Sequence, residues 1–516
     1  MTEKFVIVID LGTNSNKAGV VSLDGEIISK VSKESQLTYP APGLVEQDPQ
    51  TMYQASLEII SSALEKSKVS KKQIAAIGVT GQMAGIMGID KNWNPVTHYD
   101  SWLDNRCKPY IKEIKEKGNK EYINTCGMPV TISHAAKMLW WKKERPKAYD
   151  KIHKFILPAA YVAGRLANLD GDEAFVDHSY LHFTGMVDAE KMEWSKKLSD
   201  LLEIPIEKMP KIINPWDVIG ELTQKEADKC GLQAGIPIIA GAGDTAASFF
   251  GTGLTEPGEL IDVAGTASVL GGCVEDFRPD VENETMIFPR AINTDYWYPL
   301  SFVGGGGLCL RWFRDTFAQK EKEIAKKRDI DPYELLNERA SKLPPGSDGI
   351  LFIPHLAGRT FPSNSSVKGS WTGFSWNHKK EHFYRAILES IAFEYNYYLD
   401  IIKKLFPEMT FTQVRGVGGG SCSDLWNQIK ADVLGIEYLK VDEEDVGLKG
   451  LAIIAAKGVG LIYNMEEKIN KIVKTTTTYQ PRQKYVKVYE EYTNIYNQMI
   501  SDLNSTFTKL DQISDI

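Results

Sequence analysis

Several common signatures are missing from this chain of 516 residues, and each absence argues against a class of protein. No run of 18 apolar residues occurs, so no membrane-spanning helix is expected. The N-terminal apolar stretch ends at Asp10 without a small-residue cleavage site, which argues against a signal peptide. Six cysteines are present without a CxxC pair, which predicts neither a zinc site nor a disulfide framework. We therefore expect a cytoplasmic protein.

Excess positive charge is also missing, because the formal net charge is −8. Nucleic acids and anionic membranes are bound by basic surfaces, so neither is expected as a partner. The lysines and arginine of residues 320–328 alternate with Glu321 and Glu323, which is typical of a solvated helix face. The length and the 43% content of hydrophobic residues instead predict two or more domains with a sizeable core.

The common nucleotide-binding fingerprints are absent as well, since neither GxxxxGK[ST] nor a GxGxxG after the first strand occurs. What is present is an alternation of strand and helix patterns, which predicts an α/β fold with a mixed sheet. The expected strands are residues 5–9, 17–23, 27–31 and 74–79, with a helix over 50–67. Further helices are expected over 308–318, 382–405, 424–434 and 485–507, and the threonines of 475–478 predict a loop or an edge strand.

The opening of the chain recurs about half a chain later. Residues 8–15 (VIDLGTNS) and 261–268 (IDVAGTAS) both run from an apolar strand through Asp to Gly-Thr. This repetition predicts two domains of similar topology that face each other. Glycines and a proline within 247–257 indicate the boundary, so we expect an N-terminal domain over 1–248 and a C-terminal domain over 249–516.

The first of these turns has the groups that bind phosphate. A phosphate chain needs backbone N–H donors in an uncrowded turn, a hydroxyl and a cation. These groups come from Gly12, Thr13, Asn14 and Lys17, while the carboxylate of Asp10 suits Mg²⁺. An ordinary hairpin turn is the alternative interpretation.

A second candidate follows the expected strand at residues 237–240. Asp244 stands between Gly243 and Thr245, where a strand gives way to a helix. It could simply cap that helix. Alternatively, the flanking glycines would let a substrate hydroxyl reach its carboxylate, which would accept the proton as the oxygen attacks phosphorus.

Two glycine-rich turns of the second half complete the pattern. Gly265-Thr266 offers a second set of N–H and hydroxyl donors. The run from Gly416 to Gln428 (GVGGGSCSDLWNQ) opens a helix with a flat backbone suited to an adenine ring. Each segment is a weak signal alone, but together they indicate an ATP-dependent transferase.

These segments resemble the FGGY family of carbohydrate kinases, in order and spacing, over most of the chain. The family opens with D-x-G-T and a basic residue four positions later, here Asp10 to Lys17. It carries a strand-end G-x-G-D, here residues 241–244, and a C-terminal signature similar to residues 418–432. The motif W-x-D-x-R is also present, at Trp102 to Arg106.

The resemblance implies two actin-like ATPase (ribonuclease H-like) domains around a central cleft, with sugar mainly on the first and ATP mainly on the second. It implies Asp244 as catalytic base and Asp10 as the residue that positions Mg²⁺ with ATP. The expected nucleotide contacts are Gly12, Thr13, Asn14, Lys17, Gly265, Thr266, Gly307, Arg311, Gly419 and Ser423. The expected substrate contacts are Gln82, Met83, Ala84, Trp102, Asp104 and Asp244.

The sugar side departs from the family at several positions. Ala84 replaces the His of the Gln-Met-His-Gly found in xylulokinases, and Ala160 replaces an Asp of many members. His134 stands where a small residue or Pro is usual and could reach into the space, and His178 lies where the first domain lines its substrate side. Both histidines could equally be buried polar groups of the core.

We expect phosphorylation of a small sugar or polyol, first a ketopentose such as xylulose. The alternatives are a kinase for a tetritol, L-xylulose or gluconate, or a catalytically inactive actin-like scaffold that binds nucleotide. Because members of the family are often dimers, a homodimer is also expected.

Overall fold

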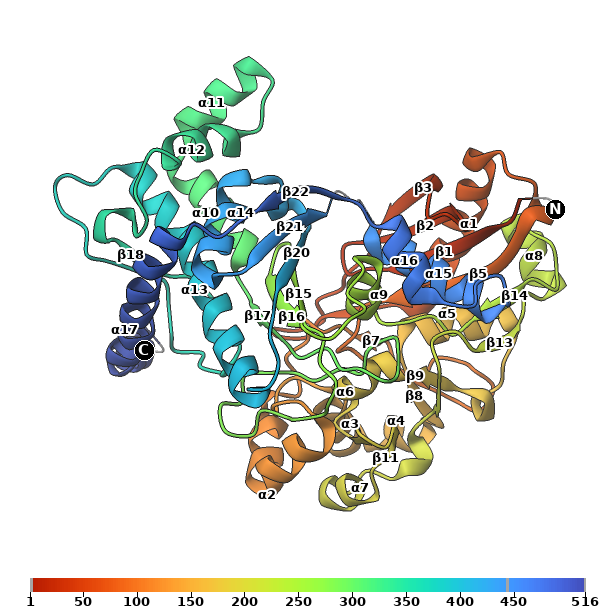
Figure 1. The fold of residues 1–516 in the computed structure, drawn as a ribbon. Helices are drawn as coiled ribbons and strands as arrows, with labels where there is room; N and C mark the ends of the chain where they lie inside the picture. The colour runs from red at the N-terminus through yellow and green to blue at the C-terminus, as the bar shows by residue number, and fades with distance from the viewer. Residues whose placement is uncertain (1–2, 442–444, 515–516) are drawn as a thin grey trace.

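The computed structural model describes residues 3–441 and 445–514, which form two lobes that each contain a six-stranded sheet (Figure 1). The first sheet has the order β13-β14-β5-β1-β2-β3. Its strands are β1 (Phe5–Leu11), β2 (Ser15–Ser22), β3 (Ile27–Glu34), β5 (Ile74–Gly81), β13 (Val218–Glu221) and β14 (Pro237–Ile239). Both β1 and β14 pair in parallel with β5, while the outer strands are antiparallel.

The second sheet repeats this arrangement, with the order β17-β16-β15-β20-β21-β22. Its strands are β15 (Glu259–Ala264), β16 (Ser268–Gly272), β17 (Leu300–Val303), β20 (Gln413–Val417), β21 (Glu437–Val441) and β22 (Thr475–Tyr479). The strands β15, β20 and β21 are parallel, and β16, β17 and β22 are antiparallel to their neighbours. The internal repeat predicted from the sequence is therefore confirmed, and the threonine-rich segment is an edge strand.

Helices cover both sheets. In the first lobe, α1 (Pro49–Ser67) packs on β2 and β3, and α5 (Pro158–Ala167) packs on β5. In the second lobe, α13 (Lys380–Leu405) contacts α10 (Gly306–Phe317), α12 (Pro332–Ala340), α14 (Asp424–Leu434) and α17 (Gln483–Ser514). A smaller group, α2 (Lys108–Cys126), α3 (His134–Glu144), α4 (Pro146–Lys151), α6 (Leu181–Thr184) and α7 (Lys196–Leu202), lies below the two sheets in Figure 1.

One segment from late in the chain packs on the first sheet. The apolar helix α15 (Val446–Gly458) contacts β1, β5 and α9 (Asp244–Gly251), and α16 (Met465–Ile472) follows beside it. In Figure 1 these two blue helices lie among the red strands of the N-terminal lobe. Residues Leu451, Ile453 and Ala455 share a buried core with Val6 and Val8 of β1. The first lobe thus contains residues from both halves of the chain.

The structure also refines several expectations about the elements. Asp10 lies inside β1 rather than in the turn that follows it, because β1 continues to Leu11. Residue 248, the expected domain boundary, falls within α9, and the chain crosses to the second sheet over residues 252–258. Five cysteines are buried, whereas Cys422 is exposed. Within residues 3–441 and 445–514, no helix is long and apolar enough to cross a membrane.

Candidate active site

The carboxyl ends of three parallel strands bring the two candidate carboxylates together. Asp10 is the second-last residue of β1, and Asp244 is the first residue of α9, which follows β14. Since both strands run parallel to β5, these ends meet at one edge of the sheet. A bridge between Gly81 and Gly243 continues the pairing beyond the strands.

Glycine is required where β14 approaches β5. The backbone of Gly241 has a φ of +80°, and a Cβ there would collide with the carbonyl oxygen of Val79. The next turn is held by Thr80, whose hydroxyl donates to the carbonyl of Ala242. These contacts fix the position at which Asp244 emerges.

The two carboxylates are close enough for the charge of Asp10 to influence the ionisation of Asp244. Burial raises the pKa of Asp244 to about 7, and the nearby negative charge of Asp10 adds to this shift. The Oδ1 atom of Asp244 accepts hydrogen bonds from the backbone N–H and the hydroxyl of Thr245, at 2.6 and 3.2 Å. Burial also raises the pKa of Asp10 to about 6, against the opposing effect of Lys17.

The predicted phosphate turn is linked to the predicted sugar side. The hydroxyl of Thr13 donates to Oε1 of Gln82 at 3.3 Å and accepts from the indole N–H of Trp102 at 2.8 Å. Gln82 in turn donates to Gln47 at 2.6 Å. Gly12 closes the turn by donating to Ser15, and Asn14 is exposed beside it. The turn therefore has exposed backbone and a hydroxyl whose orientation is set by Trp102.

Lys17 forms an ion pair with a residue from the second half of the chain. Its ammonium lies 3.2 Å from a carboxylate oxygen of Asp445, which also pairs with Lys30. Lys17 stands directly opposite Asp10 in the pairing of β1 with β2. A phosphate that binds Lys17 would compete with Asp445 for the same charge.

On the second sheet, the predicted nucleotide contacts line the corresponding edge. The turn at Gly265 and Thr266 follows β15, and its two carbonyls accept from the N–H groups of Gly307 and Leu308, at 3.2 and 3.1 Å. Arg311 lies one turn further along α10 and is exposed. The start of α10 is therefore anchored to this turn.

The neighbouring strand β20 ends in the other glycine-rich turn. Gly418 has a φ of +88°, and Gly419 is exposed with open space around it. Ser423 caps α14 by accepting from the N–H of Trp426 at 3.2 Å. Because β15 and β20 are parallel, this turn lies beside Gly265, so the structure brings these predicted residues to one edge.

The aspartate of β15 that corresponds to Asp10 has a different environment. Asp262 is fully buried and accepts from the hydroxyls of Tyr395 and Tyr438, at 2.6 and 2.7 Å, and from Lys430. All its partners are core residues of the second lobe. Both halves of the repeat therefore have an aspartate at this position, but Asp10 is partly exposed whereas Asp262 is buried.

The predicted substrate contacts divide into two groups. Met83 packs against Gly243, next to Asp244. Ala84 is partly exposed, and Trp102 is exposed. Asp104, in contrast, is fully buried. Its carboxylate accepts from the backbone of Val45 and from the guanidinium of Arg106, at 2.7 to 2.9 Å. This geometry argues against the expected contact of Asp104 with substrate and makes it a support for the Trp102 segment.

Three buried side chains gather around Met83 and were not assigned together from the sequence. Tyr99 lies beside Gly85 and near Asp244, and His134 lies beside the backbone of Met83 and Gly85. The third is His182, close to His134. Within the described residues, the Tyr99 hydroxyl, His134 Nε2 and His182 Nδ1 have no hydrogen-bond partner. The three residues come from separate parts of the chain, so the sequence does not show that they lie together. The only signal for each is a polar side chain within a mostly apolar segment.

His178 lies apart from these groups. Its Nε2 donates to the carbonyl of Ala291 at 2.9 Å, and the side chain is buried. This bond favours the interpretation of His178 as a buried polar group of the core, and its Nδ1 has no hydrogen-bond partner within the described residues.

A small cavity lies between the two lobes next to Asp244. It has a volume of about 100 Å³ and is lined by Met83, His182 and Thr245 from the first half, and by Val269, Leu300 and Phe302 from the second sheet.

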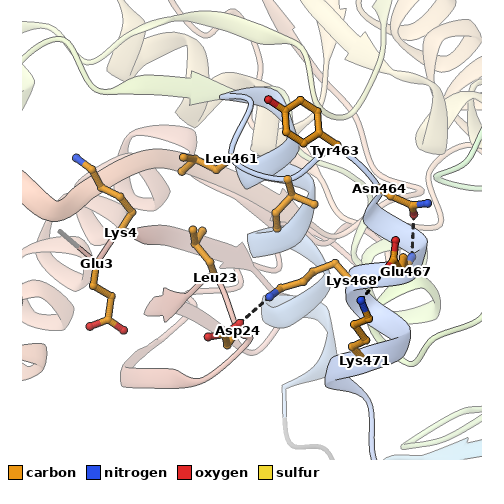
Figure 2. A pocket seen from close by; sticks show the side chains of 11 residues that line it. Glu3, Lys4, Leu23, Asp24, Leu461, Tyr463, Asn464, Glu467, Lys468 and Lys471 are labelled. Carbon is orange, nitrogen blue, oxygen red and sulfur yellow. Dashed lines mark hydrogen bonds and ion pairs between the residues drawn. The ribbon is translucent and has the colours of Figure 1, made fainter. Parts of the chain in front are cut away.

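A pocket of about 750 Å³ lies elsewhere (Figure 2). It lies at the opposite end of β1, around Lys4 and the turn at Asp24. Two ion pairs lie along it, Asp24 with Lys468 at 2.6 Å and Glu467 with Lys471. Seven residues of strand span about 20 Å, so this pocket is remote from the two carboxylates.

Oxygen atoms are the donors available for a metal at the site. Among residues 3–441 and 445–514, no group of three or more His, Cys, Asp or Glu side chains could hold a metal ion. Mg²⁺ needs no such group, because it keeps waters and takes its other ligands from phosphates and one or two carboxylates. The carboxylate of Asp10 fits this requirement.

Comparison with known proteins agrees with the family resemblance and the fold. At 28% identity over 511 residues, the chain is similar to a gluconokinase of Bacillus subtilis, with 98% of this chain and 97% of that protein covered. A xylulose kinase of the same organism is 28% identical over 508 residues, with 97% and 98% covered. The fold matches a ligand-bound xylulose kinase from Lactobacillus acidophilus with a TM-score of 0.89 at 24% identity, covering 98% of this chain and 100% of that one.

Two family models together match most of the chain. Residues 5–251 match the N-terminal domain of the FGGY family of carbohydrate kinases, and residues 262–459 match its C-terminal domain. The two sheets with their paired edges are the actin-like fold expected from the sequence. The chain therefore belongs to the FGGY family of carbohydrate kinases.

Proposed function

We propose that this carbohydrate kinase transfers the γ-phosphoryl group of ATP to a hydroxyl of a small polyhydroxy substrate, with a ketopentose such as xylulose as the first candidate. The observation that carries the proposal is the position of Asp244 at the start of α9, close to Asp10 and beside a cavity between the lobes. The names of relatives support the class of substrate, since a xylulose kinase is among them.

Asp244 is the proposed catalytic base. Its carboxylate would accept the proton of the substrate hydroxyl as that oxygen attacks the γ-phosphorus, in line with the leaving oxygen of ADP. A pKa raised by burial to about 7 keeps the group basic enough to take a proton near neutral pH. Thr245, which donates twice to Oδ1, fixes the orientation of the carboxylate.

The turns of the two sheets are the proposed nucleotide contacts. Lys17 and the N–H groups of Gly12, Thr13 and Asn14 would bind phosphate from the first sheet, and Gly265 and Thr266 from the second. The exposed backbone at Gly419, with Gly307, Arg311 and Ser423, would hold the adenosine. Mg²⁺, held through Asp10, would supply positive charge that offsets the negative charge of the phosphates.

Gluconate is the second candidate substrate, because the gluconokinase of B. subtilis is as similar as the xylulose kinase. A buried carboxylate needs a cation. The buried Lys137 already donates to the carbonyls of Asp100, at 3.1 Å, and Ser101, while Lys17 pairs with Asp445. These engagements leave neither lysine free for a carboxylate, which favours a neutral substrate, whereas the Nε of Arg290, without a hydrogen-bond partner within the described residues, is a cation that gluconate could use. A tetritol and L-xylulose remain alternatives, whereas the convergence of Asp10 and Asp244 disfavours an inactive scaffold.

The proposal is tested by ADP release with Mg–ATP against a panel of ketopentoses, aldoses, tetritols, glycerol and sugar acids. Strong turnover on one neutral sugar is expected. Turnover on gluconate alone would replace the first candidate by the second. If ATP bound but no compound of the panel released ADP, the kinase proposal would give way to the scaffold.

Two further expectations stay predictions. The family suggests a homodimer, which sedimentation of the purified protein would test. The cytoplasmic location expected from the sequence is likewise a prediction, to be tested by fractionation of the producing cell.

A further inference from the structure

Two lysines of the first sheet share one carboxylate from the second half of the chain. Asp445 directly precedes α15, and its Oδ1 lies 3.2 Å from the Nζ of Lys17, while its Oδ2 pairs with Lys30. The side chain of Asp445 is 9% exposed, whereas those of Lys17 and Lys30 are 35% and 39% exposed. The carboxylate is therefore enclosed, but both lysines remain open to solvent.

The pairing of β2 with β3 places the two lysines on the same face of the sheet. Lys17 stands opposite Ser32, and Lys30 is two residues from Ser32 along β3. The helix α15 covers this face two residues further along β2, where a Cβ at Gly19 would lie 3.7 Å from Leu448. The packing of α15 on the first sheet thus brings the carboxylate that precedes it to the lysines.

The position of α15 does not depend on Lys17. Its first residue, Val446, approaches α9 so closely that a Cβ at Gly251 would lie 2.0 Å from the Val446 carbonyl oxygen. Apolar residues of α15 are also buried against β1. Because Lys30 pairs with Asp445 as well, loss of the contact with Lys17 would leave the carboxylate in place.

A phosphate and the carboxylate of Asp445 compete for the same cation. Lys17 stands directly opposite Asp10, beside the predicted phosphate turn. An ammonium that lies against a carboxylate must give up that contact before it can turn to a phosphate. The apparent affinity for a phosphate is therefore lower than it would be if Lys17 had no partner.

We propose that Asp445 sets the affinity of the nucleotide site: it holds Lys17 in the unliganded protein, and bound ATP takes Lys17 over while Lys30 keeps the carboxylate. Asp445 thereby weakens the binding of ATP without contacting it. This inference rests on the proposed function, which assigns the phosphates of ATP to Lys17.

The test measures the Kd of Mg–ATP by calorimetry. Asp445→Asn should bind ATP about tenfold more tightly, because the competing charge is gone. Lys30→Gln should bind it about threefold more weakly, since Asp445 then attracts Lys17 more strongly. A residue that only supported the fold would weaken binding in both variants. Unchanged or weaker binding by folded Asp445→Asn would overturn the proposal, and so would tighter binding by Lys30→Gln.

A double-mutant cycle separates this exchange from the general effect of a negative charge near the phosphates. In the Lys17→Gln background, Asp445→Asn should change the Kd of ATP by less than about twofold, because the lysine for which the two anions compete is absent. The full tightening in that background would show that Asp445 acts on the phosphates directly and would contradict the proposed exchange.

Asp24→Asn is the matched control. Asp24 also pairs with a lysine between the first sheet and the C-terminal helices, Lys468 of α16, but at the end of the sheet remote from the phosphate turn (Figure 2). Its substitution should leave the Kd of ATP within about twofold, and a tightening as large as that of Asp445→Asn would count against the proposal.

The binding measurements also distinguish this inference from the proposed function. Wild-type protein that bound no ATP would reject the proposed function, and the inference would fall with it. Normal ATP binding that neither Asp445→Asn nor Lys30→Gln altered would reject the inference alone.

Discussion

Individual residues at equivalent positions of the two sheets have diverged in environment. Asp10 and Asp262 both precede a Gly-Thr turn, which the sequence shows clearly. Only the structure shows that Asp262 is enclosed by Lys430, Tyr395 and Tyr438, whereas Asp10 remains partly exposed near Asp244. The same residue type is thus enclosed by the core in one half and, in the other, is the residue proposed to hold Mg²⁺.

This difference predicts opposite effects for two identical substitutions. Asp10→Asn should raise the Mg²⁺ concentration needed for half-maximal ADP release by tenfold or more, because the carboxylate that holds the ion is lost. Asp262→Asn should instead lower the melting temperature, since it leaves the Lys430 charge buried without its partner, at a cost of about 3–5 kcal/mol. A normal magnesium requirement in the folded Asp10→Asn variant would count against the role of Asp10.

Among the elements, the end of β14 sets the position of the proposed base. The chain turns there at Gly241, whose Cα faces the Val79 carbonyl of β5 so closely that no side chain fits. Gly231 also has a positive φ, of +72°, but its surroundings are open. Substitution of Gly231 therefore measures the free-energy cost of the left-handed backbone alone, and substitution of Gly241 adds the cost of the steric clash.

We expect Gly231→Ala to lower the free energy of unfolding by about 1–2 kcal/mol, the cost of a left-handed conformation. Gly241→Ala should cost at least about 2 kcal/mol more, because it also forces β14 away from β5. Chemical denaturation of both variants measures the difference. Equal losses would mean that the approach of the two strands is not tightly set.

Much of this element structure could be predicted from the sequence. Apolar runs and turn residues located β1, β2, β3, β5 and the helix at Asp424–Leu434, and the Gly-Thr recurrence predicted the second sheet. The packing of α15 on the first sheet could not be predicted, because its apolar surface shows that it is buried but not against what. Asp104 stands in the same W-x-D-x-R motif as Trp102, and the motif does not show that other segments of the chain enclose its carboxylate fully.

At the scale of the whole molecule, buried hydrogen bonds connect the first half of the chain to the second. His178 of the first half donates to the carbonyl of Ala291, in the segment between β16 and β17. Burial lowers the pKa of His178 to about 4, so the folded protein keeps this histidine neutral. In the unfolded chain the pKa is about 6.5, and the histidine takes up a proton below that pH.

The stability contributed by neutral His178 is therefore present above about pH 6.5 and is lost as the pH falls toward 4. The difference in unfolding free energy between wild type and His178→Gln should decrease by about 3 kcal/mol over this interval, at about 1.4 kcal/mol per pH unit. Using the difference cancels the opposite pH dependence of buried carboxyls such as Asp177, whose pKa burial raises to about 7. A difference that did not vary with pH would contradict the burial of a neutral histidine.

The central claim is that Asp244 removes the proton from the substrate hydroxyl, and the rate of a single turnover tests it most directly. Asp244→Asn keeps the size of the side chain but removes its basicity, so transfer of the γ-phosphoryl group should slow by about 10²–10⁴-fold. The Kd for ATP should stay within about twofold, because the account assigns nucleotide binding to other residues. Transfer at close to the wild-type rate, with ATP bound normally, would contradict the claim.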